Sequence, residues 1–190
     1  MKKFISILFF QCLFAQSFVE FDLTKSFISY DGKHPAHNWT GISKDIQGTF
    51  EINKQDLTQS KVDLFVPVFS FDSKNANRDS NMLDVVEEYY YPFVRFTSSK
   101  INKSESGFDV VGNLSFHGIT KEFTIPVELN EDNENIIVTS DFSIMLTDFK
   151  IKRPALLTIK IRNQVDIKVY LVGSIAVSYT HLTLPTICSV

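Results

Sequence analysis

The chain has 190 residues, 44% of them hydrophobic, and a formal net charge of -3. This acidic balance offers no basic surface of the kind that nucleic acids require, and it equally disfavours anionic membrane surfaces as partners. The 18 Phe residues beside a single Trp indicate a wide apolar interior with few polar groups, although an AT-rich genome would also raise the Phe content.

Residues 1–17 are predicted to form a secretory signal peptide. Two lysines at positions 2 and 3 precede an apolar run from Phe4 to Phe14, and the small residues Ala15 and Ser17 follow. The run is shorter than the roughly 20 residues of a membrane-spanning helix, which argues against an uncleaved anchor. A lipoprotein signal is disfavoured because bulky residues precede Cys12. We therefore expect export to the periplasm or the extracellular space.

Residues 18–174 are predicted to form one mainly β domain. Both cysteines, Cys12 and Cys188, lie outside it, so the domain is expected to fold without a disulfide. Alternating apolar and polar residues predict eight strands, at 18–33, 45–53, 61–71, 92–102, 107–116, 120–129, 135–146 and 164–173. Eight strands with polar turns between them and almost no helix indicate an antiparallel barrel or sandwich.

The stretch from Val111 to Val127 predicts a β-hairpin with its turn at His117-Gly118. Leu114 and Phe116 share one face of the first strand, and Phe123 and Ile125 share one face of the return strand. Polar residues alternate with them. One face of this hairpin is therefore expected to line the interior.

Two segments depart from the strand pattern. Apolar residues recur at helical spacing from Arg78 to Tyr91, and Pro92 would end such a helix. We expect one short helix across a sheet edge or a barrel mouth. The stretch from Thr147 to Arg162 is predicted to be a loop followed by an edge strand.

Residues 175–190 are predicted to be a non-native tail. From Val177 the sequence mixes polar and apolar residues without a period, and it resembles a translated sequencing adaptor. His181 and Cys188 therefore carry no functional argument. The alternative is a genuine flexible tail.

Catalytic and metal-binding patterns are weak. His34 and His37 could bind a metal only with a further ligand such as His117 or Asp31, and Pro35 makes a helix that would align them unlikely to form. These histidines are expected to shape a turn, and no metal site is predicted. The chain has no serine elbow, glycine-rich phosphate loop or Cys-His pair. We therefore predict that it is not an enzyme.

Arg78 and Asp79 form the most pointed polar cluster, because they stand where a strand leads into the predicted helix. Charge-assisted hydrogen bonds from such a pair can fix a loop. The pair is interpreted as a structural clamp or, alternatively, as a contact to the polar head group of a ligand.

Four motifs together resemble one known family. They are Phe69-Ser-Phe-Asp-Ser73, Arg78-Asp-Ser-Asn-Met-Leu83, Tyr91-Pro-Phe-Val-Arg-Phe96 and Val111-Gly-Asn-Leu-Ser-Phe-His-Gly-Ile-Thr-Lys121. In order and spacing they are similar to the YceI-like, polyisoprenoid-binding family. The resemblance implies an eight-stranded antiparallel lipocalin-like β-barrel that holds a long isoprenoid, for example a quinone, in an apolar interior.

The resemblance and the strand faces together predict the ligand-lining residues, which are Phe50, Leu64, Phe96, Leu114, Phe116, Phe123, Ile125 and Phe142. The expected partner is an apolar, chain-like lipid, with no covalent cofactor, no nucleic acid and no stable membrane insertion of the mature chain. A stress or surface-interaction barrel with a filled core and no small ligand is the alternative. Which one holds depends on whether the interior contains a tunnel.

Overall fold

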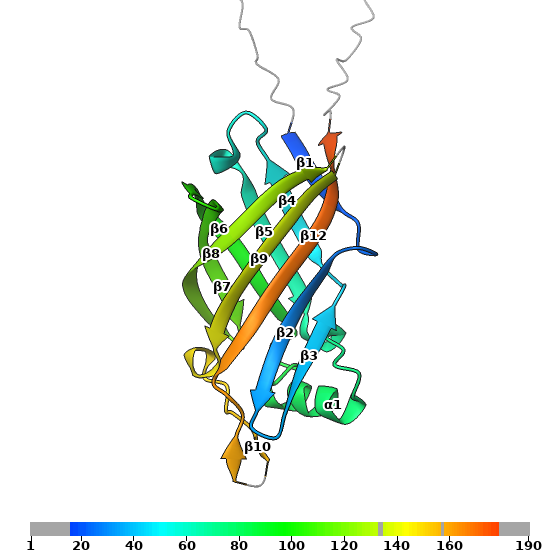
Figure 1. The fold of residues 1–190 in the computed structure, drawn as a ribbon, viewed down its shortest axis with the longest axis vertical. Helices are drawn as coiled ribbons and strands as arrows, with labels where there is room; N and C mark the ends of the chain where they lie inside the picture. Colours follow the sequence, from blue (N-terminus) through cyan, green and yellow to red (C-terminus); the bar gives the residue numbers. More distant parts are fainter. Residues whose placement is uncertain (1–15, 133–134, 157, 179–190) are drawn as a thin grey trace, which may run out of the picture.

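The computed structural model describes residues 16–132, 135–156 and 158–178 of the chain. These residues form a closed eight-stranded antiparallel barrel with one α-helix, which confirms the predicted fold (Figure 1). Around the barrel the strands follow the order β1, β4, β5, β6, β7, β8, β9 and β12, and β12 pairs with β1 to close the wall. A hairpin of β2 and β3 extends the sheet from β12.

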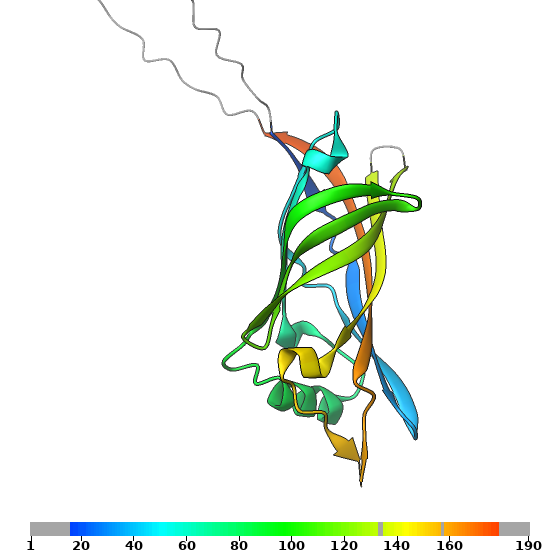
Figure 2. The ribbon, with the colours of Figure 1, turned by 90° about the vertical axis from the view of Figure 1, so that its left-hand side faces the viewer.

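The strands are β1 (Gln16–Phe21), β2 (Phe27–His34), β3 (His37–Ser43), β4 (Gln47–Ile52), β5 (Lys61–Pro67), β6 (Phe93–Ser104), β7 (Gly107–Phe116), β8 (Ile119–Asp132), β9 (Asn135–Met145), β10 (Ala155–Leu156), β11 (Ile159–Lys160) and β12 (Gln164–Ser178). The helix α1 spans Ala76–Val85, and three 3-10 turns span η1 (Leu57–Gln59), η2 (Val68–Ser70) and η3 (Leu146–Phe149). In Figure 2, α1, η3 and the small β10–β11 hairpin lie at one end of the barrel, which we call the α1 end.

The first predicted strand is broken in two. β12 pairs with β1 through residues 173–178 and with β2 through residues 166–170, so β1 and β2 act as two halves of one long strand. The turn at residues 22–26 separates them. The same break recurs in the neighbouring pair of strands. β3 pairs with β2, whereas β4 pairs with β1 and β5.

Ser26 bridges the break in the ladder along β12. Its side chain is fully buried, and its hydroxyl accepts a hydrogen bond from the Val172 N–H (2.9 Å) and donates to the Val172 carbonyl (3.2 Å). Asp22 organises the turn, since its carboxylate accepts hydrogen bonds from the Thr24 hydroxyl and N–H. The Thr24 hydroxyl and, next, Lys25 lower the pKa of Asp22 to about 2, so the carboxylate is charged at neutral pH.

Because of this break, β3 does not pair with β5 within the described residues. Within the described residues, β3 is joined to the following segment by a single bridge, in which Ile42 and Asp72 exchange two backbone hydrogen bonds of 3.0 Å. The fully buried Ser43 adds a side-chain hydrogen bond to Ser70 (2.6 Å). The segment containing η2 and α1 therefore covers this side of the barrel, close to where a helix across a mouth was expected.

The hairpin at His117-Gly118 forms as predicted. Phe116 pairs with Ile119, so only two residues make the turn, and their φ angles of 50° and 70° are those of a type I′ turn. The His117 ring lies 2.8 Å from the Phe149 carbonyl through Nδ1 and 3.0 Å from the Glu87 carboxylate through Nε2. The turn thus holds together η3 and the loop after α1.

Several boundaries differ from those predicted. β3 was not predicted, and α1 ends at Val85 rather than Tyr91, because Glu87 takes a left-handed φ of 50° that stops the helix. The stretch 147–162 holds η3 and the β10–β11 hairpin rather than a loop and one edge strand. β12 continues to Ser178, past the predicted end of both strand and domain, and β1 begins at Gln16. Most of the predicted signal peptide and tail, residues 1–15 and 179–190, lies outside the described residues.

The substitution Ser26→Ala tests the bridge across the broken ladder. It would leave the buried Val172 N–H without an acceptor, and an unsatisfied buried donor costs about 1–3 kcal/mol. We expect the free energy of unfolding, measured by urea titration, to fall by that amount. The matched control is Ser174→Ala, at an exposed position two residues further along β12, which should change stability by less than about 0.5 kcal/mol. Equal effects of the two substitutions would contradict this role of Ser26.

Candidate functional site: an apolar cavity inside the barrel

The barrel encloses a cavity of about 620 Å³. Its wall is almost wholly apolar and is built from inward-facing side chains of the barrel strands, of the β2–β3 hairpin and of α1. Phe96, Phe116 and Phe142 point inward yet are only half-buried, because part of each ring faces the cavity. The interior is therefore hollow.

Seven of the eight residues predicted to line the interior lie on the cavity wall. They are Phe50, Leu64, Phe96, Leu114, Phe116, Ile125 and Phe142. Phe123 faces the same way but is not on the wall, because its ring stacks with that of Phe149 at 6.1 Å and an interplanar angle of 13°. Phe149 belongs to η3, which covers this part of the barrel end. Contact of any of these residues with a ligand remains a prediction.

The sequence prediction missed a large share of the wall. β12 contributes Val165, Ile167, Val169 and Leu171, α1 contributes Met82 and Val85, and Val86 follows directly after the helix. The β2–β3 hairpin contributes Tyr30, His34, His37 and Trp39. Tyr30, Gly32 and His34 alternate along β2 and share this face, which could have revealed it. The face was missed because its row consists of aromatic residues and a glycine instead of aliphatic residues.

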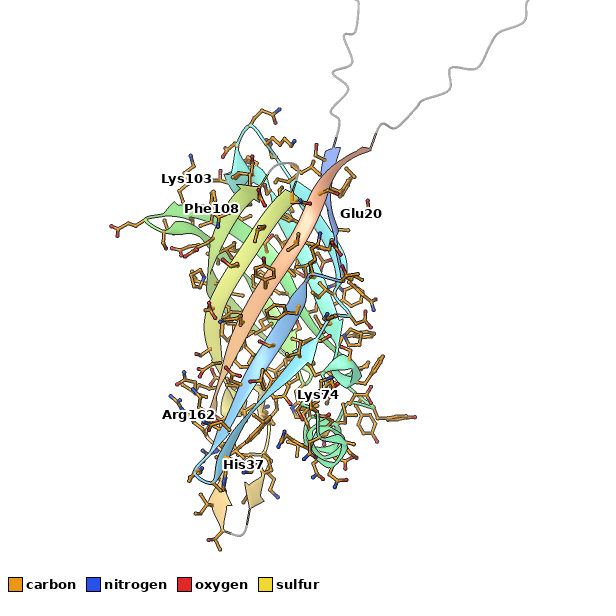
Figure 3. All side chains as sticks on the ribbon, turned by 45° about the vertical axis from the view of Figure 1, so that its right-hand side comes forward. Glu20, His37, Lys74, Lys103, Phe108 and Arg162 are labelled. Carbon is orange, nitrogen blue, oxygen red and sulfur yellow. The ribbon has the colours of Figure 1, made fainter. Side chains whose placement is uncertain are left out.

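The two ends of the cavity differ in polarity. The polar wall residues Arg78, Asn81 and Arg162 lie at the α1 end, with His37, whereas Leu57, Phe108 and Leu129 line the opposite end. Figure 3 shows His37 and Arg162 at the α1 end and Phe108 far from them. Ser60 and Ser140 add hydroxyl groups elsewhere on the wall, but the arginine side chains of the wall are confined to the α1 end.

Two aromatic residues lie flat across glycines of the neighbouring strand. Tyr30 pairs with Gly41, and Trp39 pairs with Gly32. A Cβ atom on either glycine would collide with the facing ring, so the glycines make the space that the rings occupy. Tyr30 also packs edge-on against Phe71 at 5.6 Å. Both rings are thereby held on the cavity wall.

The Tyr30 hydroxyl has no hydrogen-bond partner, although it is buried. Burial is the main influence on the pKa of this phenol and raises it, while the nearby Trp39 indole lowers it less. The group therefore stays protonated at physiological pH and can donate. An unsatisfied buried hydroxyl is unfavourable, so this one marks a place where a ligand acceptor would be stabilised.

Arg78 and Asp79 form a clamp around Ser73. The Asp79 carboxylate accepts the Ser73 N–H at 3.1 and 3.2 Å, and Arg78 Nη1 donates to the Ser73 hydroxyl at 3.2 Å. The Arg78 guanidinium also lies 5.4 Å from the centre of the Trp39 ring, as a cation–π contact. The pair has the geometry of the proposed structural clamp, and Arg78 also reaches the cavity wall.

His34 and His37 do not meet further ligands of the metal-binding type. His34 is buried, its Nδ1 accepts the Ala36 N–H at 3.1 Å, and its Nε2 lies 3.2 Å from the Ile159 carbonyl. His37 packs its ring against Trp39 at 5.5 Å. Across the described ranges, no group of three His, Cys, Asp or Glu side chains is placed to bind a metal. His34 instead ties the β2–β3 hairpin to β11.

Solved structures of low sequence identity share this fold. BcnA of Burkholderia cenocepacia superposes with a TM-score of 0.73 at 22% identity, over 82% of this chain and 100% of that protein. A domain from Saccharophagus degradans, described as polyisoprenoid-binding, superposes with a TM-score of 0.62 at 15% identity, over 83% and 97% of the two chains. In the described part of the chain, no helix is long and apolar enough to cross a membrane.

Curated relatives match a shorter stretch. The UPF0312 protein plu2095 of Photorhabdus laumondii is 30% identical over 107 residues, and Protein YceI of Escherichia coli is 29% identical over 107 residues. Each alignment covers 55% of this chain and 56% of the relative, so the chain matches about half the length of these proteins. The model of the YceI-like domain matches residues 19–173, which span every barrel strand. The chain therefore belongs to the YceI-like domain family.

Proposed function

We propose that this protein binds one isoprenoid lipid in its barrel and carries or stores it, without catalysing a reaction. The observation that carries the proposal is the apolar cavity of about 620 Å³, a volume within the range of about 300–1,000 Å³ of small-molecule sites. The structural neighbour described as polyisoprenoid-binding supports the same class of ligand.

Burial of an apolar chain would supply the affinity. Each ligand CH2 group removed from water contributes about 0.8 kcal/mol, so a long chain needs few polar contacts. The wall fits such a ligand because its side chains are aliphatic and aromatic over most of the length. The filled-core alternative loses support for the same reason, since a filled barrel would leave no space beside Phe96, Phe116 and Phe142.

The ligand's polar group is proposed to lie at the α1 end. There the Tyr30 hydroxyl lacks a partner, and the Trp39 and Arg78 side chains reach the same cavity. A quinone carbonyl oxygen could accept a hydrogen bond from the Tyr30 hydroxyl. The tail would then extend toward Phe108 and Leu129, where the wall is apolar.

The binding proposal is tested by native mass spectrometry of protein purified from its own host, and by uptake of a long-chain quinone into lipid-free protein. We expect one lipid per chain. Val169→Trp adds bulk to the cavity wall and should reduce the bound fraction severalfold without unfolding the barrel, whereas a filled core would lose about 1–3 kcal/mol of stability. Lys168→Trp, at the adjacent exposed position on β12, is the control and should bind normally. Absence of both copurified lipid and quinone uptake would rule out the proposal.

The head-group position is tested with Tyr30→Phe. Loss of one hydrogen bond costs about 0.5–1.5 kcal/mol, so affinity for a long-chain quinone should fall roughly threefold to tenfold. Affinity for squalene, an isoprenoid hydrocarbon without an acceptor, should stay the same. Because the hydroxyl has no partner in the protein, the variant should unfold at the same temperature as the parent or higher. Equal losses for quinone and squalene would place the head group elsewhere.

We also propose that the protein is exported and acts in the periplasm or outside the cell. The apolar run after Lys2 and Lys3 supports this, and β1 begins at Gln16, so cleavage after Ala15 would leave the first strand whole. Intact mass and fractionation of the protein from a Gram-negative host should show a shortened, periplasmic chain. An uncut chain that remains in the cytoplasm would contradict export.

A further inference from the structure

We propose that the α1 end of the barrel docks on the surface of an anionic phospholipid bilayer. The contact is a basic rim, defined by Lys150, Lys152, Arg153, Lys160 and Arg162, together with exposed apolar side chains around it. The idea rests on the proposed function for its cargo, because a protein that carries an isoprenoid must exchange it with a membrane. The docking itself requires no bound lipid.

Positive charge is concentrated at this rim. Residues 146–162 contain five of the chain's 19 basic residues but only one of its 22 acidic residues. Within the described part of the chain, none of the five rim cations forms an ion pair. The two acidic residues that flank the rim in sequence are already engaged, Asp148 with Lys121 at 3.2 Å and Asp166 with Lys33 at 2.6 Å. Arg153 donates to the Ile161 carbonyl at 3.3 Å and Arg162 to the Gln164 amide oxygen at 2.8 Å, but both partners are neutral, so the rim keeps its positive charge for lipid phosphates.

The rim borders the wall of the cavity. Pro154, Ala155, Ile161 and Arg162 belong to the cavity wall, and the β10–β11 hairpin between them projects from the α1 end (Figure 1). The hairpin is fixed to the β2–β3 hairpin, since the Arg162 N–H donates to the Lys33 carbonyl at 2.8 Å and His34 contacts the Ile159 carbonyl. A bilayer bound here would lie next to this part of the cavity wall.

Exposed apolar side chains gather at the same end. Of the eight large hydrophobic residues that are exposed among the described residues, six come from segments of this end: Phe69, Tyr89, Tyr90, Phe93, Met145 and Ile159. Tyr89 is 87% exposed and Ile159 is 50% exposed. Tyrosine and other aromatic rings favour the boundary between water and lipid. Exposed Asp84 and Glu87 near Tyr89 and Tyr90 oppose part of the attraction, but the combination of basic and aromatic groups matches a bilayer interface better than the surface of an acidic protein.

The opposite end of the barrel carries exposed charges of both signs. Glu105, Glu128 and Glu131 lie there together with Lys54, Lys100 and Lys103, at a distance from the rim that exceeds the Debye length of about 8 Å at physiological salt. The two ends therefore act almost independently. An anionic surface would attract the basic rim more strongly than the mixed charges of the opposite end, and the barrel would bind with its α1 end toward the lipid.

Flotation of lipid-free protein with vesicles tests the docking. We expect binding to phosphatidylcholine vesicles that contain phosphatidylglycerol, and little binding to phosphatidylcholine alone. The triple variant Lys150→Gln, Lys152→Gln, Lys160→Gln should reduce partitioning at least about tenfold, since each surface cation contributes severalfold. The matched control, Lys54→Gln, Lys100→Gln, Lys103→Gln, removes the same charge from exposed positions in the opposite half of the barrel and should bind like the parent. Ile159→Ser should weaken binding with the charge unchanged.

Three outcomes would overturn the docking: no binding to anionic vesicles, equal binding to neutral vesicles, or equal losses in the two triple variants. Cargo binding is measured separately, without vesicles, by quenching of the fluorescence of the single Trp39 on the cavity wall with a long-chain quinone. Quenching without flotation would reject the docking and leave the proposed function standing. Flotation without quenching would reject the proposed function and leave the docking standing.

Discussion

The break between β1 and β2 is the feature on which the rest of this barrel depends. β12 is too long for either strand to pair with it alone, so Ser26 carries the ladder across the gap at Val172. Beyond the gap, β2 pairs with β12, and β2 and β3 form a hairpin that extends the sheet. β3 then lies apart from β5, and the segment from η2 through α1 fills the opening. A regular eight-stranded wall would have had no such gap and no helix beside it.

The hollow interior follows from the kinds of side chain that the break brings together. Tyr30 and Trp39 are large, but each lies flat over a glycine, so they extend along the wall and leave the space before them open. Phe123 and Phe149, in contrast, stack and close the end beneath η3. Eight strands give a barrel that can either fill with side chains or hold one ligand. Here the paired glycines favour the second outcome, because they let both rings lie against the wall.

The sequence predicted the regular parts of this molecule well and the irregular parts poorly. The hairpin at His117-Gly118 was evident because aliphatic and polar residues alternate on both strands and a glycine occupies the turn. β3 was missed because its inward positions are His37, Trp39 and Gly41, which do not form an apolar row. Tyr89 and Tyr90 continue the helical spacing of α1, but both are exposed after a left-handed Glu87. Periodicity also placed Phe123 on the correct face, while η3, which separates it from the cavity, depends on contacts distant in sequence.

Net charge is a poor guide to the partners of an elongated barrel whose two ends are built from different segments. The value of -3 disfavoured anionic membranes as long as charge was taken as spread evenly over the domain. The fold concentrates the cations instead, because residues 146–162 form a single excursion between β9 and β12 at the α1 end. The gap beside β3 and the basic rim both arise where strands stop pairing regularly. Function at this end therefore depends on the irregular segments, and the regular strands serve to hold those segments in one place.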